Sequence, residues 1–166
     1  VDATFIPRQD ARAHVAILTN DILVIDTETG ETVAVKSLPD IHDFYSSIHY
    51  VAGETLEDGV LVVLLQNSSI VRRLVGLDPK TLEVLWQSVS GNLGNVSMVA
   101  NIDSDPADEI VTTGGYVFDS QTGANQWLFT NTSSTQIHPL YNESLGRVEV
   151  QVRTAAPINN QLLQRI

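Results

Sequence analysis

The sequence contains no cysteine, and this absence excludes several kinds of site at once. A chain without thiols forms no disulfides, binds no metal through thiolates and offers no cysteine nucleophile. The compartment stays open on this criterion, because many periplasmic proteins also lack cysteine.

Basic residues are also scarce, since nine Lys and Arg stand against twenty Asp and Glu, for a formal charge of −11. Such a field repels phosphates, so we expect no nucleic-acid partner. Long apolar runs are missing too. The longest is VLVVLL at 60–65, whereas a membrane-spanning helix needs about 20 residues, so we expect no membrane span.

Recognised catalytic motifs are also absent. The sequence has no Gly-rich phosphate loop, no serine in a nucleophile elbow and no His-x-x-x-His pair. We therefore expect no catalytic residue within this chain.

What the sequence does contain is a series of short β-type runs separated by turn signals, which predicts an all-β fold. Marker positions recur 46, 49 and 38 residues apart, at Val15, Leu61, Ile110 and Val148. Periods of about 40–50 residues with four strands each are typical of a β-propeller. We predict one propeller segment over 1–166 with three to four four-stranded antiparallel blades, at approximately 13–52, 59–101, 109–141 and, in part, 147–166.

The ends of the chain suggest a piece of something longer. The chain begins without methionine and stops inside an apparent strand, and about three and a half blades fall below the four that close a ring. We expect it to be excised from a larger propeller.

A turn motif repeats three times without gaps, and its aspartates are Asp26, Asp78 and Asp119. A threonine follows three residues later, and the next position holds Gly30, Leu82 or Gly123. The carboxylate and hydroxyl can accept hydrogen bonds from backbone amides, while glycine supplies the positive φ of a tight corner. Because Leu82 replaces glycine, we expect the second corner to be the least regular.

Tryptophan follows two of these corners, since Trp86 and Trp127 stand eight residues after their Asp. We predict that each indole docks against the adjoining blade and donates its N–H to a carbonyl. The alternative is that both are simply large core residues.

At these residues the sequence resembles the PQQ-like propeller repeat, with its small-x-Asp-x-x-Thr-Gly-x-x-x-Trp pattern, over most of residues 13–131. The resemblance implies a propeller of the kind found in quinoprotein dehydrogenases and in non-enzymatic scaffold proteins. The quinone-contacting residues and vicinal cysteines of the enzymes have no match here.

An acidic loop precedes the strand at Ile110, and its oxygen-bearing residues alternate along the chain. Side-chain oxygens of four residues and one carbonyl could surround a single Ca²⁺ ion, which accepts six to eight oxygens. The predicted ligands are Asn101, Asp103, Asp105, the carbonyl of Ala107, and Glu109. In the alternative interpretation the carboxylates only cap backbone amides.

This loop is similar to the calcium-binding loops of FG-GAP and integrin-α-type propellers. It departs from them at Asn101, which replaces a charged ligand, and at Pro106, which replaces a glycine. Both departures are expected to weaken the site.

Three interpretations of the sequence remain. The favoured one is a non-catalytic propeller segment, periplasmic, cell-surface or secreted, which acts as a scaffold, adhesion or recognition module for a protein or carbohydrate and pairs with further blades or a second copy. The second is a fragment of a quinoprotein or polysaccharide-degrading enzyme whose active residues lie outside the chain. The third is a different all-β fold such as a sandwich.

Overall fold

The structure is a computed structural model that describes residues 1–8, 13–37, 44–55, 58–66, 71–103, 105–128, 135–142 and 147–154, with the backbone alone at 44–46, 135–142 and 147–154. Every regular element in these ranges is a β-strand. The same residues include no helix of the length and apolarity that crossing a membrane requires.

Three four-stranded sheets follow one another along the chain, each an antiparallel meander in sequence order. The first sheet contains β1 (Asp2–Pro7), β2 (Ala13–Leu18), β3 (Asp21–Asp26) and β4 (Thr32–Ser37). The second contains β5 (Phe44–Val51), β6 (Val60–Gln66), β7 (Arg72–Leu77) and β8 (Val84–Gln87). The third contains β9 (Val96–Ala100), β10 (Glu109–Thr112), β11 (Tyr116–Asp119) and β12 (Asn125–Leu128). A hairpin of β13 (Thr135–Asn142) and β14 (Arg147–Thr154) ends the described chain.

The sheet boundaries differ from the expected blade boundaries by one strand, which is a correction to the ranges 13–52, 59–101 and 109–141. β5 pairs with β6 and belongs to the second sheet, while β1 supplies the first strand of the first sheet and β9 that of the third. The sequence pattern of β5 suits pairing with either sequence neighbour, and the structure shows that it pairs with β6. Of the expected partial blade, residues 155–166 lie outside the described residues.

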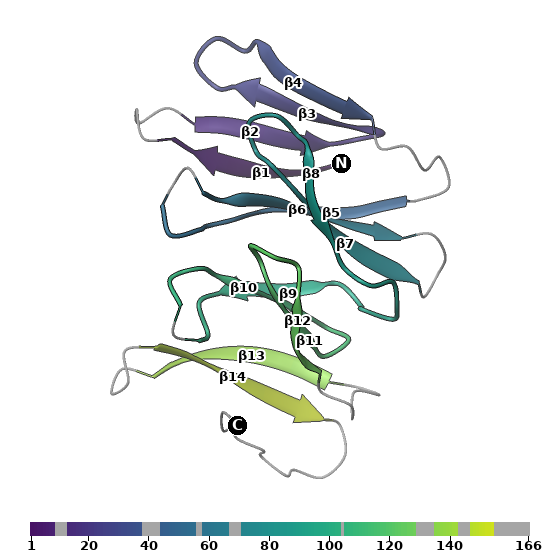
Figure 1. Cartoon of the computed structure of the whole chain (residues 1–166), viewed down its shortest axis with the longest axis vertical. Coiled ribbons are helices and arrows are strands. Elements are labelled where there is room, and N and C mark those ends of the chain that lie inside the picture. The colour runs from purple at the N-terminus through teal and green to yellow at the C-terminus, as the bar shows by residue number, and fades with distance from the viewer. Residues whose placement is uncertain are drawn as a thin grey trace.

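The sheets stack face to face, with the second sheet between the other two (Figure 1). β6 shows why, because its apolar residues alternate between two cores. Leu61, Val63 and Leu65 pack against the first sheet, in a core that includes Ile22 and Val24. The residues between them pack with Ile110 and Phe118 of the third sheet.

This two-sided burial rules out a two-sheet sandwich, in which each sheet would bury one face in a single shared core. The all-β expectation is therefore confirmed. Three four-stranded antiparallel meanders stacked in chain order are the arrangement of part of a β-propeller.

Neighbouring sheets are also joined along their first strands. The Asp2 carboxylate on β1 accepts a hydrogen bond from the amide of Ile48 on β5 at 2.9 Å, and the Thr4 hydroxyl accepts one from the amide of Tyr50 at 3.1 Å. Side chains of one sheet thus bind edge amides of the next.

Candidate functional site: repeated corners and an acidic loop

The three corners share one hydrogen-bond pattern. Oδ1 of Asp26, Asp78 and Asp119 accepts two hydrogen bonds each, from the backbone amides two and three residues later, at 2.8–3.0 Å. The corner threonine hydroxyl then accepts one from the amide two residues further on, at 3.2–3.3 Å. A bulge follows at the same place in each sheet, on the strand leaving the corner.

The expected irregularity of the second corner is absent. Leu82 adopts a φ of 59°, close to the 73° of Gly30 and the 69° of Gly123, and its amide donates to the Asp78 carbonyl as the glycine amides do at their corners. The conformation is strained for leucine. Burial offsets the strain, because Leu82 is 1% exposed in the core between the first and second sheets.

Trp86 joins the second sheet to the third. Its indole is 8% exposed, and Nε1 donates to the carbonyl of Ser120 at 2.8 Å. The ring lies against two glycines, since a Cβ added to Gly76 on β7 or to Gly123 at the third corner would lie 2.2 or 2.4 Å from an indole carbon. Trp86 therefore occupies space that a glycine in each sheet leaves open.

Trp127 occupies the same position in the third sheet, opposite Val117, and is half-buried. Its docking on the following hairpin stays a prediction, because the side chains of β13 and β14 lie outside the described residues.

The interface between the first and second sheets and the one between the second and third place their large and small residues in opposite positions. Ala34 holds the tryptophan position of the first sheet and packs against the core that contains Leu82 of the next corner. At the following interface Trp86 meets Gly123. The second interface thus has its large residue on the strand and its small one at the corner, and the first has the reverse. We infer that Leu82 compensates for the small Ala34.

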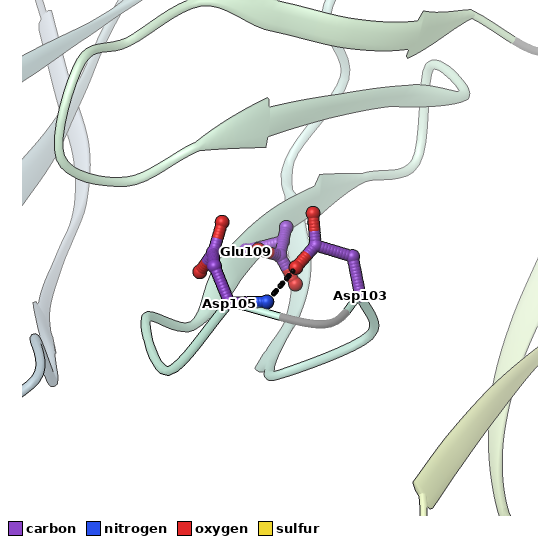
Figure 2. A group of neighbouring side chains, drawn as sticks. All are labelled: Asp103, Asp105 and Glu109. Atoms are coloured by element: carbon purple, nitrogen blue, oxygen red, sulfur yellow. Dashed lines mark hydrogen bonds between the residues drawn. The ribbon is translucent and has the colours of Figure 1, made fainter.

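The acidic loop brings three of its predicted ligands together (Figure 2). The carboxylates of Asp103, Asp105 and Glu109 each place an oxygen within 4.8 Å of the other two. One oxygen of each also holds the loop. Oδ1 of Asp103 accepts from the Asp105 amide at 2.8 Å, and Oδ1 of Asp105 accepts from the Ala107 amide at 2.9 Å. Oε2 of Glu109 accepts from the Ile102 amide at 2.7 Å.

The two other predicted ligands shape the turn. The Asn101 side-chain amide donates to the carbonyl of Asp105, and Ala107 is buried. Among the described residues of the loop, no contact places the Asn101 side-chain oxygen or the Ala107 carbonyl beside the carboxylates, so their role as ligands stays a prediction.

Gln126 is a neighbour that sequence reasoning missed. Its Nε2 lies 3.5 Å from Oδ2 of Asp103, and its Oε1 is buried and has no hydrogen-bond partner within the described part of the chain. It comes from β12 at the bulge position, where no sequence signal marks a side chain that reaches back to the loop.

Among the described acids, Glu109 has the pKa that departs furthest from its ordinary value. It is 1% exposed, and its pKa is raised to about 7, mainly by burial and also by the charges of Asp103, Asp105 and Asp108, against an opposing effect of the Ile102 amide. Burial also raises the pKa of Asp108. Burial and neighbouring negative charge thus oppose ionisation of Glu109, and a bound cation would offset both effects.

The donor set fits Ca²⁺ in kind, because each carboxylate keeps a second oxygen beyond the one that holds the backbone. Three such oxygens are about half of the six to eight that Ca²⁺ accepts. The remaining positions would fall to the Asn101 and Ala107 oxygens or to water.

Stacked meanders with repeated Asp–Thr corners define the class as part of a β-propeller, and comparison with known proteins adds little to this. No family model matches the sequence, and no curated protein matches it. Among solved structures, the chain is similar to the crystal structure of BamB from Moraxella catarrhalis, with 15% identity and a TM-score of 0.48. The match covers 87% of this chain and 50% of that one, so the chain spans about half the length of that structure. A likeness at this level assigns no function.

Proposed function

We propose that this chain is a non-catalytic propeller segment that serves as a scaffold or recognition module. The observation that carries the proposal is the use of its carboxylates. Each corner aspartate accepts hydrogen bonds from two backbone amides, and Glu109 accepts one from the Ile102 amide. The acids with a defined geometry thus stabilise the architecture. The large negative charge favours a basic protein surface as partner, with a carbohydrate as the second choice.

The rival proposal is a fragment of a quinoprotein or of a polysaccharide-degrading enzyme. The two are separated by titrating the chain with PQQ and Ca²⁺ while following tryptophan fluorescence, and by a reducing-end assay on an acidic polysaccharide. We expect no saturable quenching and no new reducing ends. Turnover that disappears on mutation of a described residue would establish the enzyme instead.

A structural calcium ion is our second proposal, favoured by the convergence of Asp103, Asp105 and Glu109 within 4.8 Å. A divalent cation beside these three acids would offset their mutual repulsion, stabilise the start of β10 and lower the pKa of Glu109. The site is expected to fill at the ~0.1–1 mM levels typical of extracellular modules, in keeping with a periplasmic, cell-surface or secreted location.

Calorimetric titration with CaCl₂ tests this second proposal. We expect a one-site isotherm and a rise in melting temperature at millimolar Ca²⁺, both lost in Asp103→Ala and Asp105→Ala. Glu83→Gln, an exposed substitution at the second corner, is the matched control and should retain binding. No heat and no shift for the unmodified chain would dismiss the ion.

A further inference from the structure

The first sheet has a second apolar face, turned away from the second sheet. Its residues alternate with those of the core, as strand geometry requires. Phe5 on β1 is 69% exposed and Val35 on β4 is 59% exposed, and both rank among the most exposed large apolar side chains described. No described segment packs on this open face, which comprises Phe5, Val15, Ile17, Leu23, Ile25 and Val35.

The open face matches the buried face of the second sheet position by position. Phe5, Val15 and Ile25 lie side by side across the first sheet. Tyr50, Leu61 and Leu77 lie in the same row of the second sheet, immediately before the equivalent corner aspartate. There the row packs into the core beneath the first sheet. The open face therefore has the chemistry of a face that receives a preceding blade.

The corner of the first sheet supplies an independent observation. Gly30 has the same hydrogen bonds and nearly the same φ as Gly123, which receives Trp86. At Gly30, however, no described atom other than those of its chain neighbours lies within 4 Å of an added Cβ. The corner is built like one that accommodates an indole, and the space beside it is open.

We propose that the open face of the first sheet docks a further four-stranded blade, whose fourth strand places a tryptophan against Gly30 eight residues after that blade's own corner aspartate. This inference rests on the proposed role as a segment of stacked blades. The occupant is defined by continuity with the interface that Trp86 makes, which already shows the geometry of such a contact.

The experiment extends the whole chain with a blade known from the structure to carry the required tryptophan. A copy of residues 44–95, which includes its own connection to the next sheet, is fused ahead of Val1. In the unextended chain, Gly30→Ala meets only backbone strain, so the folding equilibrium constant should fall roughly five- to thirty-fold. In the extended chain the same change should cost at least a further tenfold, because the docked ring would leave no room for the methyl group, as at Gly123.

Two companions keep the result interpretable. An extended chain whose added blade carries Trp86→Ala should lose the extra sensitivity to Gly30→Ala. Phe5→Glu should destabilise only the extended chain, whereas Val89→Glu, at an apolar residue 70% exposed elsewhere, should affect neither.

Equal costs of Gly30→Ala in both chains would overturn the proposal. The proposal would also be overturned if sedimentation showed the unextended chain to be a dimer that Phe5→Glu dissociates. The open face would then bind a second copy of the chain. Neither result touches the contact between Trp86 and Gly123 or the absence of turnover, so the proposed scaffold function would survive both.

Discussion

The interface between the first and second sheets and the one between the second and third solve one packing problem in opposite ways. In the first, a small residue on the fourth strand, Ala34, accompanies a large one at the corner, Leu82. In the second, Trp86 on the strand accompanies Gly123 at the corner. The corner hydrogen bonds are the same in both. The two interfaces therefore share the backbone geometry of the corner, while the residues that fill the space between the sheets differ.

The largest effect should come from emptying the second interface. Trp86→Ala removes a buried indole and its hydrogen bond to Ser120, so we expect a loss of ~3–5 kcal/mol in the free energy of unfolding, measured by urea denaturation. Leu85→Ala, next to it and 51% exposed, is the control and should cost below about 1 kcal/mol. A loss under about 1 kcal/mol for Trp86→Ala would break the comparison, because the second interface would then not depend on its indole.

A smaller effect should appear when the first interface is rebuilt to match the second. Ala34→Trp alone should overpack the corner, and Leu82→Gly alone should leave a cavity, although glycine relieves the positive φ. The double variant should recover part of the loss, with a coupling energy of ~1–3 kcal/mol in a double-mutant cycle. Additive effects would mean that Ala34 and Leu82 do not share the volume that we assign to them.

The smallest effect concerns the residues paired with the corner aspartates, where the first sheet has His14 opposite Asp26 and the third has Glu109 opposite Asp119. Burial raises the pKa of Glu109 to about 7, so the folded state favours the protonated acid. Its contribution to stability is complete below its ordinary pKa of 4.5 and is lost as the pH rises through 7. We expect the melting temperature without Ca²⁺ to fall by a few degrees between pH 5 and 8, and Glu109→Gln to flatten this slope.

The corner carboxylates act in the opposite direction. Hydrogen bonds from the Thr29 and Glu28 amides lower the pKa of Asp26. At Asp78 burial raises the pKa, but hydrogen bonds from the Thr81 and Lys80 amides outweigh burial, so the pKa is lowered overall. Their contribution is present above pH 3.8 and is lost on further acidification. Acid denaturation that Asp78→Asn leaves unchanged would contradict this.

The corners and the stacked all-β fold were predictable because they depend on local chemistry that repeats: an aspartate, a threonine and a residue at positive φ. The assignment of β5 was not, because β5 has a sequence neighbour on each side and its sequence pattern suits pairing with either one. The regular corner at Leu82 was hidden because the compensating Ala34 belongs to another sheet. In the acidic loop the spacing predicts the meeting of Asp103, Asp105 and Glu109, whereas Gln126 arrives from a bulge that only the folded chain reveals.

The side chains that link β1 to β5 have a consequence for solubility. β1 and β5 are the first strands of their sheets, and exposed amides on such an edge can recruit a strand from another molecule and start aggregation. Asp2 and Thr4 occupy the amides of Ile48 and Tyr50, so part of this edge has no free donors for an intruding strand. We therefore expect these two polar residues to hinder the pairing of β5 with a strand of another molecule.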